Sequence, residues 1–179
     1  TVGGAYGTAG AVTITYTTIE GLTANAGASA NLAVTGSADY TVNAGSEADQ
    51  GEVLSSGVPI TFDGFGAANS VQLTGTGAIT VNGTTADDVF TVSAATGDVR
   101  ITGRAFIERD GTSTTLQLNG HDGDDTFNVN AAQPYTSITL SGGNPGGSDI
   151  ANLNGDGSSA AVVTLEDATG ATAASVSGT

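Results

Sequence analysis

The chain has 179 residues, of which 18 are acidic and three are basic, so its net charge is −15. Binding to nucleic acid or to an anionic membrane surface needs a basic patch, and three arginines cannot supply one. No apolar run approaches the roughly 20 residues that cross a bilayer. The absence of cysteine excludes disulfides, thiolate metal sites and a cysteine nucleophile. With 28 glycines and 38% hydrophobic residues, the chain is typical of a folded, acidic domain with small side chains.

Alternating apolar and polar residues recur along the whole chain and predict short β-strands with one buried face. In chain order, these runs cover residues 12–16, 32–35, 40–43, 60–63, 71–74, 79–82, 90–93, 99–102, 116–119, 127–130 and 138–141. The best helical candidate, residues 160–174, contains a Val-Val-Thr-Leu run that favours a strand. Asn-Gly pairs at 82–83, 119–120 and 154–155 follow alternating runs and predict tight bends. We therefore expect one all-β domain over residues 1–179.

Two architectures fit many short strands: a parallel β-helix (β-solenoid) and, as the alternative, an antiparallel β-sandwich. Three segments, beginning at Gly64, Gly83 and Gly120, share a glycine followed five residues later by Asn or Asp. These Asn and Asp positions, 69, 88 and 125, are separated by 19 and 37 residues, close to one and two coils of about 19–20 residues. A degraded fourth copy surrounds Asp149, 24 residues further on. The repeated spacing favours the solenoid.

Residues 120–128 read Gly-His-Asp-Gly-Asp-Asp-Thr-Phe-Asn and differ from the calcium-binding nonapeptide G-G-x-G-x-D-x-U-x only at His121. This segment resembles the repeats of RTX proteins. The wider stretch from Gly83 to Gly155 is similar to the repeat arrays of large bacterial extracellular and surface proteins. The resemblance implies a calcium-binding β-solenoid at the bacterial surface, and it implies no toxin or protease activity. RTX repeats follow one another directly, whereas the good copy here stands alone.

Clustered carboxylates are the candidate metal ligands, because Ca²⁺ takes six to eight oxygen ligands and tolerates irregular loops. The first candidate group lies on the nonapeptide turn, the second precedes the strand expected at 90–93, and the weakest lies near the C-terminus. In that order, the residues are Asp122, Asp124 and Asp125, then Asp87 and Asp88, then Asp149 with Asp156. The first two groups are expected to be two coils apart. The competing interpretation is that these are solvated acidic turns that bind nothing.

The remaining charged residues do not compose an enzyme site. His121 is the only histidine, and without a second histidine or a cysteine it is expected to be an exposed loop residue. Arg100, Arg104 and Arg109 would suit a polysaccharide lyase, but no acid–base pair accompanies them. Their simpler role is pairing with nearby carboxylates on the surface. We therefore expect a protein that is not an enzyme.

The chain begins at Thr1 without a signal peptide, so we expect a processed product or a piece of a longer protein. Neither terminal stretch, residues 1–7 or 171–179, has the charge, proline or amphipathic helix of a solenoid cap. Uncapped ends favour head-to-tail assembly with copies of the chain. The expected function is an extracellular structural protein that forms a fibre, filament or surface layer. The alternative is a carbohydrate-binding or adhesive module, which predicts that tyrosines 6, 16, 40 and 135 align in an exposed patch.

Overall fold

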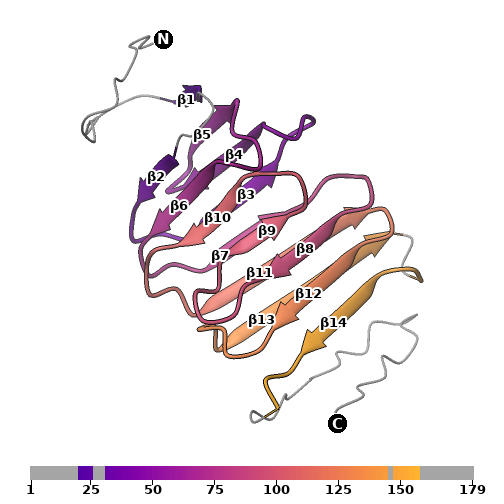
Figure 1. Cartoon of the computed structure of the whole chain (residues 1–179). Coiled ribbons are helices and arrows are strands. Elements are labelled where there is room, and N and C mark those ends of the chain that lie inside the picture. The colour runs from indigo at the N-terminus through magenta and orange to yellow at the C-terminus, as the bar shows by residue number, and fades with distance from the viewer. Residues whose placement is uncertain (1–19, 26–30, 145–146, 158–179) are drawn as a thin grey trace.

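A computed structural model describes residues 20–25, 31–144 and 147–157, and these residues form 14 β-strands and no helix (Figure 1). The strands are β1 (Leu22–Asn25), β2 (Asn31–Thr35), β3 (Tyr40–Ala44), β4 (Gly51–Ser55), β5 (Val58–Asp63), β6 (Ser70–Thr74), β7 (Ile79–Asn82), β8 (Val89–Val92), β9 (Val99–Ile101), β10 (Phe106–Arg109), β11 (Thr115–Asp122), β12 (Thr126–Asn130), β13 (Ser137–Asn144) and β14 (Ile150–Asn154). The all-β class is confirmed, and ten of the 11 predicted strands fall on observed ones. The runs at 12–16 and 160–174 lie outside the described residues.

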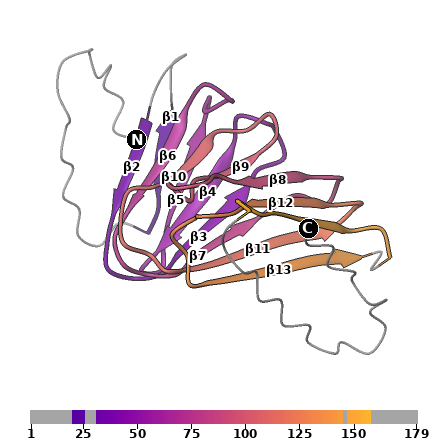
Figure 2. The ribbon, with the colours of Figure 1, turned by 60° about the horizontal axis from the view of Figure 1, so that its bottom comes forward.

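The strands form two seven-stranded sheets that face each other across the core (Figures 1 and 2). The first sheet has the order β1-β5-β4-β3-β7-β11-β13, and the second has the order β14-β12-β8-β9-β10-β6-β2. Both sheets are mixed. Neighbours are parallel along β3-β7-β11-β13 and β8-β12-β14, whereas β3-β4-β5 and β8-β9-β10 are antiparallel meanders. Figure 2 shows the strand direction turning from the β2 end to the β13 end.

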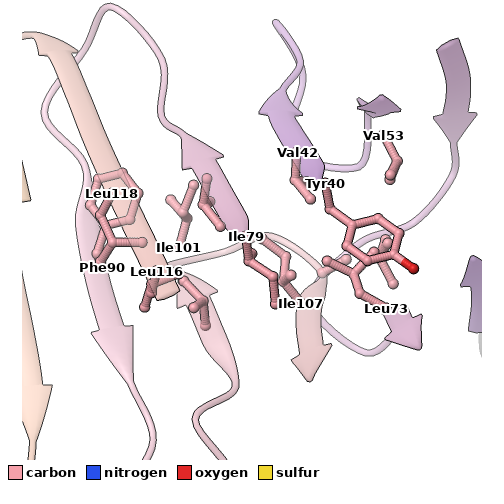
Figure 3. Close-up of a cluster of buried hydrophobic side chains, with 14 of the residues drawn as sticks. Tyr40, Val42, Val53, Leu73, Ile79, Phe90, Ile101, Ile107, Leu116 and Leu118 are labelled. Atoms are coloured by element: carbon pink, nitrogen blue, oxygen red, sulfur yellow. The ribbon is translucent and has the colours of Figure 1, made fainter. Parts of the chain in front are cut away.

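The core lies between the sheets and follows from the alternation in the sequence. In the first sheet, Tyr40, Ile79 and Leu116 stand side by side in one inward column, each fully or almost fully buried. Leu73 and Ile107 project toward them from the second sheet (Figure 3). Burying one such aliphatic side chain contributes about 1.5–3 kcal/mol, so the columns are the main stabilising element.

Parallel neighbours are further apart in sequence than the predicted 19–20 residues. Tyr40 lies beside Ile79, 39 residues later, and Ile79 lies beside Leu116, 37 residues later. Only at the C-terminal end does the shift shorten, to 22 residues between Leu116 and Ile138. The predicted period was wrong because each meander adds strands before the chain returns to its starting column. The motif spacing of 37 therefore corresponds to one step between neighbouring strands.

The Asn-Gly prediction of tight bends fails at Asn119-Gly120, which lies inside β11. Neither Gly83 nor Gly120 has the positive φ that an Asn-Gly turn would give. The chain turns further on, where His121 has φ 80° and Gly123 has φ 121°. The glycines at 83 and 120 are needed for a different reason, which is the space taken by neighbouring carboxylates.

In the described part of the chain there is no helix that could cross a membrane.

Candidate functional site: polar ladders at the strand ends

The main polar feature is a column of three aspartates, each placed one residue before a strand of the second sheet. Asp88, Asp125 and Asp149 precede β8, β12 and β14, whose parallel register aligns them. The backbone N–H of Asp88 donates to Asp125 Oδ1 at 2.8 Å, and the N–H of Asp125 donates to Asp149 Oδ1 at 2.9 Å. The carboxylates of Asp125 and Asp149 thus each accept from the backbone N–H of the preceding aspartate in the column, which stabilises the register from strand to strand.

A glycine makes room for each carboxylate of this aspartate ladder. A Cβ on Gly120 would lie 2.0 Å from Asp125 Oδ2, and a Cβ on Gly142 would lie 2.0 Å from Asp149 Oδ2. At Gly83, the corresponding distance to Asp88 Oδ2 is 2.6 Å. The Gly-x₄-Asp spacing in the sequence at 83–88 and 120–125 is therefore the signature of this packing.

Asp125 is the least well satisfied member of the ladder. Its side chain is 0% exposed, and its Oδ2 has no hydrogen-bond partner. Burial raises the pKa of Asp125, the hydrogen bond from the Asp88 backbone lowers it, and the charges of Asp88, Asp149 and Asp87 raise it further. By contrast, Asp88 Oδ2 accepts from the Thr84 N–H at 2.6 Å and from the Thr84 hydroxyl at 2.9 Å. The equivalent position in the next motif, His121, supplies no such donor.

A second, more exposed column runs beside the first. Asp87 Oδ1 accepts from the backbone N–H of Asp124 at 2.8 Å, and Asp124 Oδ1 accepts from the Ser148 hydroxyl at 2.5 Å. The exposed Asp122 ends β11, opposite Asn144 of β13. The two columns bring Asp87, Asp88, Asp124, Asp125 and Asp149 to one corner of the fold. The expectation of a coil between the first two candidate groups was wrong, since they lie on directly neighbouring strands.

In each of the five carboxylates of this acidic corner, one oxygen accepts hydrogen bonds from nearby N–H or O–H groups. Among the described residues, no three or more acidic, His or Cys side chains are grouped in a way that could hold a metal ion. Calcium binding at Asp122, Asp124, Asp125, Asp87, Asp88 and Asp149 stays a prediction. Asp125 Oδ2 is the buried oxygen of this corner that lacks a donor.

Asparagine side chains form further ladders that sequence reasoning did not single out. In the first sheet, Asn82 Nδ2 donates to Asn43 Oδ1 at 2.7 Å, and Asn119 Nδ2 donates to Asn82 Oδ1 at 2.6 Å. In the second sheet, Asn152 donates to Asn128 at 2.9 Å, and Asn154 donates to Asn130 at 3.1 Å. The signal was an Asn directly after the second inward residue of several predicted strands.

An aromatic pair follows the same register. Phe90 and Phe127 are direct parallel neighbours, and their rings stack with centroids 5.0 Å apart and planes 16° apart. Like side chains therefore repeat in columns through the core as well as on the polar side. Because similar side chains face each other on neighbouring strands, each strand favours the same register in the next strand.

The arginines have partners other than the predicted carboxylates. Arg100 lies over the ring of Phe106 at 4.2 Å, and Arg109 lies over Tyr135 at 5.5 Å. Arg104 donates to the Glu47 carbonyl at 2.8 Å, and Arg109 Nε donates to the Ser113 carbonyl at 2.7 Å. In the part of the chain that the structure describes, their guanidinium groups contact rings and carbonyls, and no ion pair is formed.

The tyrosines do not form the predicted exposed patch within the described residues. Tyr40 is fully buried, and its hydroxyl lies 2.9 Å from the Gly36 carbonyl oxygen and 2.7 Å from that of Thr74. Tyr135 is also buried and donates to the Gly97 carbonyl at 2.8 Å. Burial raises the pKa of Tyr135 to about 12. Tyrosines 6 and 16 lie outside the described ranges.

A groove of about 580 Å³ crosses the C-terminal ends of β3, β7, β11 and β13. Its lining includes Ser46, Thr84, His121, Asp122 and Asn144. It places the exposed His121 among hydroxyl and amide groups.

No protein-family model, curated protein or solved structure matches the chain significantly.

Proposed function

We propose that this chain is an extracellular structural protein: a parallel β-solenoid that assembles head to tail into a fibre, filament or surface layer. Its two sheets would form the two sides of the solenoid, and the meanders would be local insertions in it. The support comes from the parallel register and from the columns of like residues that cross it.

The observation that carries the proposal is how the asparagine ladder and the apolar column of the second sheet end at β14. Asn152 and Asn154 use their Nδ2 groups on β12, so their Oδ1 atoms are the next acceptors in the column. Leu153, which continues the inward column of Val129, is 43% exposed. A stack that repeats by parallel pairing gains stability from each added rung, because every rung buries the apolar residues of the one before.

The acidic corner is the part of the molecule to which we assign the calcium implied by the RTX resemblance. It gathers five aspartates in a chain of net charge −15 and includes the unpartnered Asp125 Oδ2. A divalent cation there would reduce repulsion between like charges on adjacent strands.

The test is the length and mass of the particles formed by the purified full chain. Static light scattering should give masses that grow with concentration, and negative-stain microscopy should show rods of variable length. A monodisperse monomer over a wide concentration range, with and without calcium, would contradict the proposal.

A second function is favoured by the groove across β3, β7, β11 and β13, which suits a neutral polysaccharide strand. Its lining includes hydroxyl, amide and imidazole groups, and these recur on successive strands spaced about 4.8 Å apart. In this case the chain would be an adhesive module. Affinity electrophoresis in gels containing neutral polysaccharides would detect it, and Thr84→Val should then remove the retardation.

A further inference from the structure

We infer that the edge formed by β13 and β14 of one copy docks the edge formed by β1 and β2 of a second copy, by continued parallel pairing. This inference rests on the proposed function and specifies its interface. We call the two surfaces the C-edge (β13 and β14) and the N-edge (β1 and β2). Each edge holds the terminal strands of both sheets.

The polarity of the strands makes this docking geometrically simple. In the first sheet, β1 is parallel to β5, and β5 reaches β3 through two antiparallel steps, so β1 runs in the same direction as β13. In the second sheet, the antiparallel steps at β9 also cancel, so β2 runs in the same direction as β14. A second copy can therefore continue both sheets at once by translation along the stack, without reversing its direction.

The alternation of side chains matches at the two edges. On β14, the inward residues are Ala151 and Leu153, which continue the columns of Phe127 and Val129. On β2, the residues that face the core are Leu32 and Val34. Aligned with inward residues together, Leu153 meets Val34, and the outward Asn152 meets Ala33. The first sheet behaves in the same way, with Ile138 and Leu140 of β13 opposite Leu22 and Ala24 of β1.

Charge and exposure single out the same strands. None of the four edge strands carries a charged residue, with the sequences LTAN, NLAVT, SITLSGGN and IANLN. Close approach at these edges is therefore free of the repulsion expected elsewhere in a chain of net charge −15. Two of the three exposed large hydrophobic side chains in the described residues, Ile150 at 54% and Leu153 at 43%, lie on β14.

The backbone of β14 is also ready to pair. The N–H of Ile150 donates to the Asp125 carbonyl at 2.8 Å, which directs Ile150 toward the β12 side. Because N–H directions alternate along a strand, the N–H groups of Ala151 and Leu153 point the opposite way. Among the described strands, none pairs with that side of β14. A second copy whose strand runs in the same direction supplies the missing partners, so it is the occupant to which we assign this edge.

Cysteine cross-linking tests the interface, because the chain has no cysteine of its own. The inferred register places Asn152 of one copy beside Ala33 of the next, at the spacing of neighbouring strands, which suits a disulfide. A full chain carrying both Asn152→Cys and Ala33→Cys should form a ladder of oligomers on mild oxidation. It should form roughly tenfold more cross-linked product than Asn152→Cys or Ala33→Cys alone, because only the double variant brings two thiols within bonding range.

Each outcome has one meaning. A ladder in the double variant alone supports the interface. Efficient dimers of Asn152→Cys alone would show that two C-edges meet, and this would overturn the inferred docking. Filaments in the microscope without any cross-link would overturn the interface but leave the proposed function standing. Monomers throughout would overturn both proposals, and a slow reaction of the Asn152→Cys thiol with maleimide would then show that another part of the same chain covers the C-edge.

Discussion

Asp88 and Asp125 are 37 residues apart in the chain but are joined directly, because the backbone N–H of Asp88 donates to Asp125 Oδ1 at 2.8 Å. The bond is made by a side chain that is itself fully buried. It couples two neighbouring parallel strands at their N-terminal ends, where pairing begins. The same arrangement recurs from Asp125 to Asp149, so the register of three strands depends on two carboxylates.

Asp125→Asn should stabilise the fold at neutral pH by about 1–3 kcal/mol, the usual cost of an unsatisfied buried polar group. The amide keeps an acceptor for the Asp88 N–H, and its Nδ2 takes the place of the unpartnered Oδ2, near the Gly142 carbonyl. Urea unfolding at pH 7 measures the change. A loss of stability would show that the charged carboxylate is needed.

The difference in stability between Asp125→Asn and the parent chain should change with pH in one direction. The pKa of Asp125 is raised by folding, so the folded chain keeps its proton to higher pH than the unfolded chain. The stability contributed by Asp125 is complete below its unfolded pKa and is lost as pH rises through the folded pKa. The advantage of Asp125→Asn should therefore grow from acid toward neutral pH. An advantage that is constant or shrinks as pH rises would contradict this.

Gly120→Ala should destabilise the fold by about 1–3 kcal/mol, as overpacking of a close contact does. The added Cβ would lie 2.0 Å from Asp125 Oδ2 and 2.7 Å from the Gly142 carbonyl oxygen, so backbone must move. Gly147→Ala is the matched control, since a Cβ there meets nothing within 4 Å. Thermal unfolding of both variants is the measurement. Equal melting temperatures would contradict the glycine packing described above.

Asn82→Ala should cost about 1–3 kcal/mol, because Asn82 is the middle member of its ladder and its loss leaves both neighbours short of a partner. Asn144→Ala is the control, at an exposed position at the end of β13. Chemical denaturation compares the two. A ladder that only decorates the surface would give the same small change in both.

Calcium should raise the melting temperature of the parent chain, and the increment should disappear in chelator. Asp87→Asn and Asp124→Asn together remove two charges from the acidic corner and should reduce the increment. Differential scanning calorimetry with added CaCl₂, with MgCl₂ as the control, checks this. A melting temperature that is the same in calcium and in chelator would mean that these aspartates act only as hydrogen-bond acceptors within the fold.

Ala151→Pro should shorten the assemblies without unfolding the protein. The Ala151 N–H faces away from β12, so proline removes an edge donor but none of the internal ladder bonds. Ala151→Val keeps the donor and should assemble like the parent chain. Light scattering gives the mean mass of each. Equal masses for the proline and valine variants would exclude pairing through this edge.

The sequence predicted the strands well where alternation was clean, as in 79–82, which matches β7 throughout. It missed the edge strands β1 and β14. It also missed β4, which opens with Gly-Glu, and β10, where Phe106 and Ile107 are adjacent and two charged residues follow. Both belong to meanders. The repeated turn motif marks one turn per coil, so it gives no information about strand pairing within a meander. The error in the period has the same origin.

The acidic corner was partly predictable. The Gly-x₄-Asp motif located the right residues, because glycine and carboxylate share one small space. The sequence could not show that the carboxylates accept backbone bonds from a neighbouring strand, since that depends on register. Nor could it show that the arginines would lie over Phe106 and Tyr135, because the first contact depends on strand pairing and the second on the packing of a loop against a strand.

The two meanders add strands in a balanced way. The β3-β4-β5 meander lies wholly in the first sheet, and β8-β9-β10 lies wholly in the second, so each sheet totals seven strands. Deleting two strands from either meander would leave one sheet with five strands and the other with seven. The larger sheet would then extend past the smaller one. Over evolutionary time, we expect such insertions to be gained or lost in compensating pairs, because an unmatched one would misalign every subunit added afterwards.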